Sequence, residues 1–226
     1  MCKTVKFESN VWSSTSFRER RLPYLLFKPT CATTTGTKLP LLLYLHGAGS
    51  KGENLQLVEQ SVLPQTLAET GLPFPCIVVC PQCPGSRSGW QPDLLGELLD
   101  ELITALQIDP SRVYATGISM GGRGVYELAY DYGDRLAAIV PLCAFGIPNL
   151  APRLRQLPIW AFHGDQDEVL PFARGQEMAE ALQATGSPAI FTRLEGLHHD
   201  IGETVYRSKE MWEWLKGQQR TKEFSE

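Results

Sequence analysis

Short apolar runs and amphipathic stretches alternate along most of this sequence. From about residue 40 onward, the apolar runs are continuous rather than alternating, which is typical of strands buried on both faces of a sheet. We predict a strand at each of six such runs: LPLLLYLHG (39–47), CIVVCPQ (76–82), RVYATG (112–117), LAAIVPLCAF (136–145), PIWAFHG (158–164) and AIFTRLEG (189–196).

The segments between these runs have helical periodicity. In DLLGELLDELITALQ (93–107) the leucines fall on one stripe at helical spacing, and Asp109-Pro110 is expected to end this helix and turn the chain into the next strand. Strands that alternate with helices predict an α/β fold with a mostly parallel sheet and helices on both faces. Further helices are expected from Met120 to about Tyr132, from Phe172 to about Ala184, and around KEMWEWLKG.

The first 30 residues have a different pattern. VKFESNVW and RLPYLLFKP predict two half-exposed strands, within about residues 4–28, which form an antiparallel addition to the sheet edge. The polar stretch TCATTTGTK (30–38) is expected to be a loop rather than a domain boundary. The chain has no internal repeat or linker, so we predict a single domain over residues 1–226 with a flexible tail from about residue 218.

Composition narrows the class of protein. The chain has 226 residues, of which 43% are hydrophobic and 20% charged, as in an ordinary globular protein. The net charge of −4 and the lack of a basic run argue against a nucleic-acid or membrane partner. The N-terminal MCKTVKFESN has no apolar signal region, and the longest apolar run is too short to span a bilayer. We therefore expect a cytoplasmic protein.

Six cysteines raise the question of a metal site: Cys2, Cys31, Cys76, Cys80, Cys83 and Cys143. The pair Cys80 and Cys83 forms a lone C-x-x-C, and no second such pair or histidine pair completes a zinc set. Cys76 and Cys80 lie in or beside the apolar run CIVVC. We interpret these residues as core thiols and expect neither a metal nor another cofactor.

One serine, Ser119 in ATGISMGGRG (115–124), lies between a predicted strand and a predicted helix. A serine at this position is commonly an N-cap. The surrounding glycines argue for more, since each glycine in a helical turn costs about 1 kcal/mol relative to alanine. The stretch Gly117–Gly121 matches G-x-S-x-G, in which a sharp strand-to-helix turn lifts a nucleophilic serine to the carboxyl end of the sheet. We therefore predict that Ser119 is a nucleophile.

A serine nucleophile needs a base, and the chain has four histidines, His46, His163, His198 and His199. In this architecture the chain order is serine, then acid, then histidine. His46 and His163 therefore lie too early, and either His198 or His199 is expected to accept the serine proton. The other histidine is expected to be structural or to line the substrate site.

The acid is expected in the loop after PIWAFHG, which contains Asp165, Asp167 and Glu168. An aspartate directly after glycine is often a turn former, which makes Asp165 the structural candidate. Asp167 is then the predicted triad acid. Its carboxylate would hold the imidazole tautomer and stabilise the imidazolium without taking the proton itself.

An oxyanion hole needs two backbone N–H groups. One is expected from Met120, which follows the nucleophile. For the other we choose Ala48 in the loop HGAGSKG (46–52), where glycines let main-chain donors approach a substrate closely. The alternative is that this loop is a simple glycine-rich strand exit. No G-K-[ST] follows at the spacing of a phosphate-binding loop.

Taken together, these segments resemble the α/β-hydrolase group of bacterial carboxylesterases and predicted peptidases, which is related to phospholipase/carboxylesterase and polyhydroxyalkanoate-depolymerase-type enzymes. The resemblance covers roughly residues 20–217. It rests on PLLLYLHGAGSKGEN, FPCIVVCPQCP, DPSRVYATGISMGGRGVYELA, LPIWAFHGDQDEVLP and LEGLHHDIGETVY.

The resemblance carries implications for individual residues. It implies that Asp167 is the acid, with Leu170 where the group usually has valine, and that His199 is the base. His198 stands where the group commonly has glycine. The resemblance also implies that Trp90, in GSRSGW, lies beside the acyl site; the alternative is an ordinary packed aromatic residue.

The short segment GIPNLAPRLRQL (146–157) cannot hold a helical lid, so we expect no cap domain. An open, shallow site without interfacial activation would suit small esters or the exposed end of a larger one. The expected function is a serine carboxylesterase that acts through an acyl-enzyme on a small-molecule ester. A peptidase or thioesterase with the same triad is an alternative. A non-catalytic binding protein, a lyase and a cofactor-free oxidoreductase are others.

Overall fold

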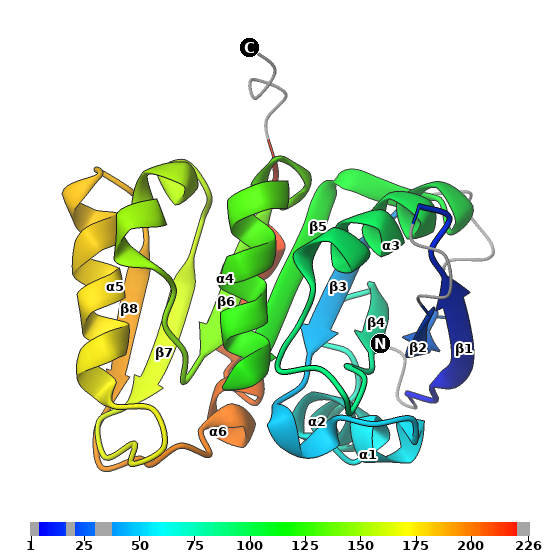
Figure 1. Ribbon diagram of the computed structural model, residues 1–226, viewed down its shortest axis with the longest axis horizontal. Helices are drawn as coiled ribbons and strands as arrows, with labels where there is room; N and C mark the ends of the chain where they lie inside the picture. The colour runs from blue at the N-terminus through cyan, green and yellow to red at the C-terminus, as the bar shows by residue number, and fades with distance from the viewer. Residues whose placement is uncertain (1–4, 17–20, 30–37, 221–226) are drawn as a thin grey trace.

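The computed structural model of the protein describes residues 5–16, 21–29 and 38–220, and the strands in these residues form one eight-stranded sheet (Figure 1). The strands are β1 (Glu8–Ser13), β2 (Arg21–Phe27), β3 (Leu39–Leu45), β4 (Ile77–Pro81), β5 (Ile108–Ile118), β6 (Ala138–Leu142), β7 (Trp160–Gly164) and β8 (Ile190–Leu194). Their order across the sheet is β1-β2-β4-β3-β5-β6-β7-β8. β2 pairs antiparallel with β1 and β4, and the other neighbours are parallel. The predicted α/β-hydrolase architecture with antiparallel edge strands is confirmed.

Helices cover both faces of this sheet. They are α1 (Leu55–Glu59), α2 (Val62–Thr70), α3 (Pro92–Ala105), α4 (Met120–Tyr132), α5 (Phe172–Ala184), α6 (Gly202–Tyr206) and α7 (Lys209–Gly217), with short 3₁₀ helices η2 (Ala48–Ser50), η3 (Gly133–Arg135) and η4 (Pro148–Leu154). One hydrophobic cluster joins the sheet to α3, α4 and α5, which lie in front of the sheet in Figure 1. The second cluster joins the other face to α1, α2, α6 and α7.

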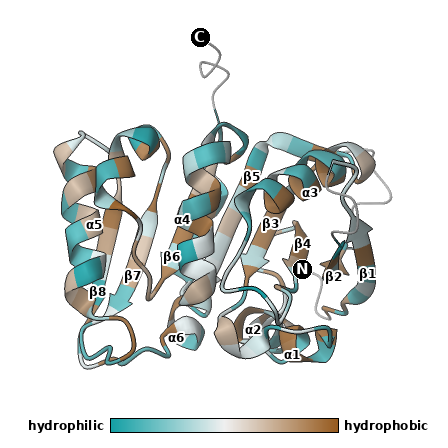
Figure 2. Ribbon diagram, in the orientation of Figure 1, coloured by the Kyte–Doolittle hydropathy of each residue, from teal (hydrophilic) through white to brown (hydrophobic). Residues whose placement is uncertain are grey.

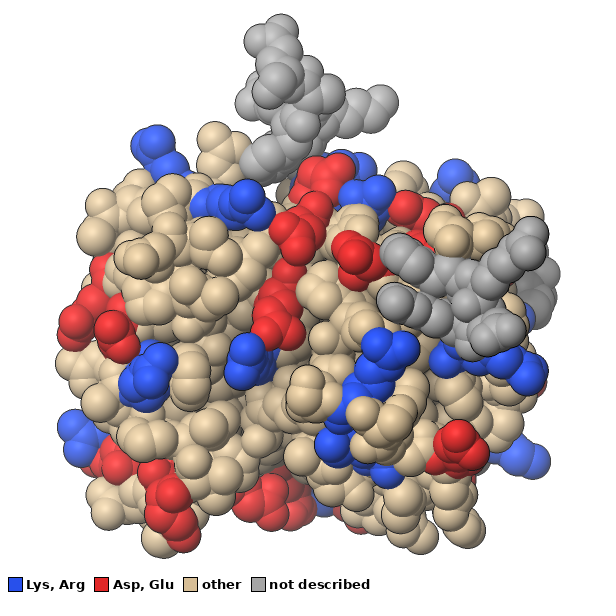
Figure 3. Space-filling model, viewed as in Figure 1, with Lys and Arg blue, Asp and Glu red and all other residues tan. Residues whose placement is uncertain are grey.

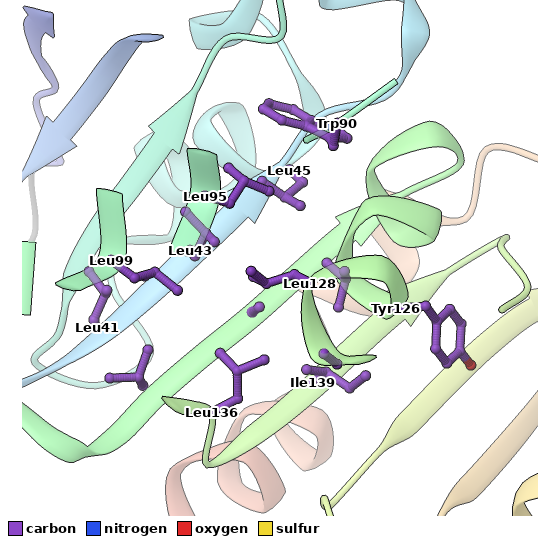
Figure 4. Close-up of a cluster of buried hydrophobic side chains, with 14 of the residues drawn as sticks. Leu41, Leu43, Leu45, Trp90, Leu95, Leu99, Tyr126, Leu128, Leu136 and Ile139 are labelled. Atoms are coloured by element: carbon purple, nitrogen blue, oxygen red, sulfur yellow. The ribbon is translucent and has the colours of Figure 1, made fainter. Parts of the chain in front are cut away.

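The central strand β3 shows how one apolar run supplies both clusters. Leu41, Leu43 and Leu45 belong to the first cluster, and Leu42 and Tyr44 belong to the second. Successive side chains of a strand point to opposite faces, so a strand covered on both sides must be apolar at every position. Figure 4 shows the three odd-numbered leucines packed towards α3, and Figure 2 shows β3 as hydrophobic over most of its length.

The start of β5 differs from its prediction. α3 ends at Ala105, and Gln107 adopts a left-handed backbone conformation with φ of 50°. β5 then begins at Ile108, so Asp109-Pro110 lies within the strand rather than in a turn before it. The register between β3 and β5 shifts at this point, which indicates that the proline is accommodated in an irregular strand end.

The segment between β6 and β7 is short, as predicted, but it is not an irregular loop. It contains the 3₁₀ helix η4, whose Ala151 and Leu154 are buried in the first cluster. Every residue from 143 to 159 is described, and no inserted domain lies among them.

The C-terminal segment is attached to the sheet as far as it is described. The Arg220 N–H donates to the Ser111 carbonyl at 2.9 Å, and the Tyr114 hydroxyl donates to the Gln218 carbonyl at 2.8 Å. Several predicted features lie outside the described residues: the rest of the tail predicted from residue 218, residues 30–37 of the loop predicted over 30–38, and the two cysteines Cys2 and Cys31. None of the described helices is both long and apolar enough to cross a bilayer.

Candidate active site

Ser119 lies at the turn from β5 into α4, at the carboxyl end of the sheet. Its backbone has φ of 57° and ψ of −119°, a conformation that costs a serine on the order of 1–3 kcal/mol and persists only where the surroundings impose it. Although Ser119 holds the N-cap position, its side chain makes no capping hydrogen bond. The simple N-cap interpretation therefore does not account for this residue.

The flanking glycines allow close backbone contact. A Cβ atom at Gly121 would lie 1.8 Å from the Leu45 carbonyl oxygen, and one at Gly117 would lie 2.6 Å from that same oxygen. This oxygen is a backbone atom, which cannot move aside as a flexible side chain could. Glycine at these two positions therefore lets α4 begin close to the end of β3.

Replacing Gly121 with alanine is expected to destabilise the protein by about 3 kcal/mol, because the added methyl group overpacks a rigid backbone contact. The midpoint of urea unfolding measures this effect. Gly133→Ala, at the other end of α4, is the matched control, since no atom lies within 4 Å of its Cβ position and its φ is −60°. Equal loss of stability in the two variants would contradict the close approach at Gly121.

Asp167 lies in the loop after β7 and is surrounded by hydrogen-bond donors. Its Oδ1 accepts the N–H groups of Val169 and Leu170, at 2.9 Å and 2.8 Å. Its Oδ2 lies 2.7 Å from His199 Nδ1 and 3.1 Å from His163 Nε2. The Asp167 side chain is fully buried, so these contacts replace the water that an ionised carboxylate needs.

These contacts determine the charge on Asp167 and the tautomers of its partners. Burial alone would raise the pKa of Asp167, but the hydrogen bonds from His199 and from the Leu170 N–H outweigh it and lower the pKa overall. An ionised carboxylate can only accept hydrogen bonds, so His199 Nδ1 carries a hydrogen and its Nε2 is left as an acceptor. His163 Nε2 also carries a hydrogen, because it lies 2.9 Å from the Leu170 carbonyl oxygen.

His198 and Asp165, the alternative candidates for the base and the acid, have different partners. His198 pairs with Glu168 at 2.9 Å, and its side chain is 67% exposed. The Glu168 carboxylate raises the pKa of His198. Asp165 bonds to Arg193 at 2.7 Å and to the Gly196 N–H at 2.8 Å, which ties the acid loop to the end of β8. The structure therefore brings Asp167, and not Asp165, to His199.

β6 connects Ser119 to the Asp167–His199 pair. The Ser119 N–H donates to the Leu142 carbonyl at 2.9 Å. The next residue, Cys143, has a thiol sulfur within 4.8 Å of both a carboxylate oxygen of Asp167 and a ring nitrogen of His199. Like Ser119, Cys143 has a left-handed backbone, with φ of 41°. The end of β6 thus contacts the Ser119 backbone through Leu142 and lies near the histidine–carboxylate pair through Cys143.

Cys143, Asp167 and His199 are also the one group of three potential metal ligands found among the described residues. A thiol must lose its proton to bind a metal, and burial raises the pKa of Cys143 to about 12. Asp167 and His199 are already paired at 2.7 Å. We interpret the group as a hydrogen-bonded cluster. Cys76, Cys80, Cys83 and Cys143 are all free and buried.

The expected oxyanion donors lie on either side of Ser119. Met120 is the first residue of α4 and Ala48 is the first residue of η2, and the first N–H groups of a helix have no partner within the helix. Gly47, which precedes Ala48, would place a Cβ atom 3.8 Å from the Cβ of Ser119. Both N–H groups therefore lie at the start of a helix, where a helix offers no internal partner, and the residue before Ala48 approaches Ser119.

The loop that carries Ala48 is anchored by buried polar side chains. Burial lowers the pKa of His46 to about 4, so its ring is neutral near pH 7. Its Nε2 accepts the Cys83 N–H at 3.0 Å, so its Nδ1 carries the hydrogen that is donated to the Gly47 carbonyl at 2.7 Å. Gln82 Nε2 donates to the carbonyls of Ser50 and Asn54, at 3.0 Å and 2.8 Å.

A pocket of about 360 Å³ opens at Ser119. It is lined by Ser88, Gly89, Trp90, Ser119, Met120, Arg123, Glu127, Phe145 and Leu170. Trp90 lines this pocket and is also buried in the first cluster, where its Nε1 donates to the His46 carbonyl at 3.3 Å. Neither His198 nor His199 is among the described residues that line the pocket.

Sequence reasoning did not place His46, His163 or Cys143 at the candidate active site. The sequence did carry a signal for the two histidines, because each ends an apolar run as a His-Gly pair. In the structure both histidines are fully buried. No comparable signal marks Cys143, whose position beside Asp167 and His199 depends on how three separate strand ends meet.

Known proteins similar to this chain include esterases and a lysophospholipase-like protein. The phospholipase/carboxylesterase family matches residues 91–215. Lysophospholipase-like protein 1 from Mus musculus is 26% identical over 224 residues, which cover 84% of this chain and 93% of that protein. A bifunctional acetylxylan esterase/xylanase from Neocallimastix patriciarum is 30% identical over 142 residues, which cover 59% of this chain and only 20% of that protein. A solved thermostable esterase is 27% identical with a TM-score of 0.77, covering 95% of this chain and 63% of that one.

Proposed function

This chain belongs to the phospholipase/carboxylesterase family and is a carboxylic ester hydrolase, and we propose that Ser119, His199 and Asp167 carry out the hydrolysis as a catalytic triad. Ser119 Oγ attacks the ester carbonyl while His199 Nε2 takes its proton. The backbone N–H groups of Ala48 and Met120 stabilise the oxyanion. The imidazolium then protonates the leaving alkoxide, and an acyl-enzyme remains on Ser119.

Water completes the cycle in the second half. His199 Nε2 accepts a proton from a water molecule, whose oxygen attacks the acyl carbonyl. Collapse of the second tetrahedral intermediate breaks the bond to Ser119 Oγ, which recovers its proton from His199. Asp167 stays ionised throughout and stabilises the imidazolium in each half.

The observation that carries this proposal is the 2.7 Å hydrogen bond between Asp167 Oδ2 and His199 Nδ1. It leaves Nε2 as the only free acceptor of the ring. The strained backbone of Ser119, its missing cap bond and the hydrogen bond from its N–H to Leu142, which precedes the Cys143 near this pair, support the serine as its partner. The lowered pKa of Asp167 supports its role as a permanent carboxylate.

We propose that the substrate is a small ester or the accessible ester at the end of a larger molecule. The short η4 segment leaves no lid between β6 and β7, and relatives include an acetylxylan esterase and a probable feruloyl esterase, each named for an ester of a larger or aromatic compound. Trp90 and Phe145 would contact the bound substrate from the walls of the pocket.

A fluorophosphonate probe and a series of p-nitrophenyl esters test the proposal together. We expect stoichiometric labelling on Ser119, located by peptide mass mapping, and turnover that decreases from short to long acyl chains. Pre-incubation with the probe should abolish turnover in proportion to labelling. Turnover that survives full labelling would contradict the serine mechanism. An increase in activity above the critical micelle concentration of a long-chain ester would contradict the open site.

A further inference from the structure

The pocket at Ser119 continues into a second hollow. This hollow, of about 300 Å³, shares Arg123, Glu127 and Phe145 with the first one. It extends from α4 towards Ile147 and towards Arg174 on α5. The two hollows therefore form one groove, and we call it the α4–α5 groove. An acetyl group would fill only a small part of it, so the groove offers contacts to a larger substrate.

Two arginines line this groove and both are accessible. Arg123 lies one helical turn after Ser119, and its side chain is 64% exposed. Its Nε lies 2.8 Å from Glu127 in an i, i+4 pair. Arg174 is 52% exposed and pairs with Glu177 at 3.4 Å. Exposed pairs of this kind contribute little to stability, so each guanidinium can exchange its present partner for a ligand.

The aromatic ring of Phe145 positions one of these charges. The guanidinium carbon of Arg174 lies 4.3 Å from the centroid of this ring, which is also shared by both hollows. The guanidinium is planar, so its N–H groups point outward from its edge when its face is stacked on a ring. There they can bind a carboxylate through two parallel hydrogen bonds. Phe145 thus lies between Arg174 and the serine end of the groove, and Arg123 lines both hollows.

Charge around the groove is more positive than the protein as a whole. The chain has a net charge of −4, whereas Arg123, Arg174 and one acidic side chain, Glu127, are the charged residues that line the groove; Glu177 pairs with Arg174 from outside the lining. Lys51 and Arg87 lie near Cys83 on the oxyanion-loop side, where their charges act to lower the pKa of that thiol. Figure 3 shows basic side chains on both sides of the lower centre of this face. Such an arrangement attracts anions towards the site.

We propose that the preferred substrate is an ester that carries a carboxylate, and that Arg123 and Arg174 bind this carboxylate while Ser119 attacks the ester. This inference rests on the proposed function, since it assigns a substrate class to the same site. The carboxylate can belong to the acyl part or to the alcohol part of the ester. In either case the two arginines determine specificity and take no part in bond making or breaking.

Matched ester pairs test the proposal. For the acyl side, mono-p-nitrophenyl esters of succinate, glutarate and adipate are compared with p-nitrophenyl alkanoates of equal chain length. For the alcohol side, 4-butyryloxybenzoate is compared with its methyl ester. Spontaneous hydrolysis at the assay pH, which for the succinate and glutarate includes attack by their own carboxylate, is subtracted first. Each kcat/KM is then divided by the rate constant of alkaline hydrolysis, which corrects for reactivity towards hydroxide. We expect the anionic member to be preferred about tenfold on one side, at one favoured chain length. Raising the ionic strength should reduce this ratio.

Three variants locate the effect. Arg123→Gln and Arg174→Gln should each lower the anionic-to-neutral ratio about three- to tenfold. Arg153→Gln is the matched control, because this arginine is 57% exposed and also ion-paired but lines a different hollow. Its ratio should equal that of the wild type. A wild-type ratio at or below one on both sides overturns the proposal, as does an equal fall of the ratio in all three variants. Absence of turnover with every neutral ester would instead contradict the proposed function.

Discussion

Replacing Ser119 with alanine is expected to lower kcat for a short-chain p-nitrophenyl ester by a factor on the order of 10⁶, because the acyl-enzyme can no longer form. The residual rate should still exceed that in water by about 10³, since the oxyanion donors and the binding pocket remain. Steady-state kinetics on rigorously purified enzyme measure both quantities. The variant should also fail to react with the fluorophosphonate probe.

Stability measurements separate this loss of activity from a loss of structure. Ser119 makes no capping hydrogen bond with its side chain, so removal of the hydroxyl should leave the free energy of unfolding nearly unchanged. Ser9→Ala, at an exposed position of β1, is the matched control and should retain wild-type kinetics. Turnover in Ser119→Ala within tenfold of the wild type would remove this serine as the nucleophile.

The strands and long helices were predictable because they are defined by local pattern. The continuous apolar run of β3 and the leucine stripe of α3 each appear within a few residues of their predicted limits. Short helices were not predicted, because one or two turns leave too little periodicity to detect. α1 covers only Leu55–Glu59 and is preceded by the N-cap residue Asn54, whose side chain accepts the Gln56 N–H. Its N-cap was the only local sign of it.

The candidate site was predictable to the level of loops but not of contacts. The order of strand ends predicts which loops meet, and this led to Ser119, Asp167 and the His198–His199 pair. The partners of Asp167 could not be deduced in the same way, because His163 and Cys143 reach it from the ends of different strands. Their positions depend on the twist of the sheet and on side-chain packing, which no local pattern encodes.

His46 and His163 show that excluding a histidine as the base does not exclude it from the site. His46 and His163 were set aside because neither could be the base. In the structure His46 holds the loop of Ala48, and His163 contacts the same carboxylate oxygen as His199. A residue excluded from the chemistry can thus still position the groups that perform it, and a buried polar side chain at a strand end is a reason to expect that role.

The adjacent histidines give the sharpest test of the proposed base. His199→Ala is expected to lower kcat by a factor on the order of 10⁶, about as much as Ser119→Ala, because the two residues act as a unit. His198→Ala is the matched neighbour and should lower kcat/KM less than tenfold, since its exposed ring pairs with Glu168 rather than with Asp167. Steady-state kinetics on both variants with one ester measure the difference.

The pH dependence of the free energy of unfolding tests separately whether His198 pairs with Glu168. Glu168 raises the pKa of His198 in the folded state, so this ion pair stabilises the protein below the unfolded-state pKa and its contribution is lost as pH rises through the folded-state pKa. Because both side chains are exposed, the contribution is small: His198→Ala should lose a little stability at about pH 5 and match the wild type at about pH 8. If His198 were the base, the kinetic results would be reversed: His198→Ala would be inactive, and His199→Ala would retain turnover despite the broken contact with Asp167.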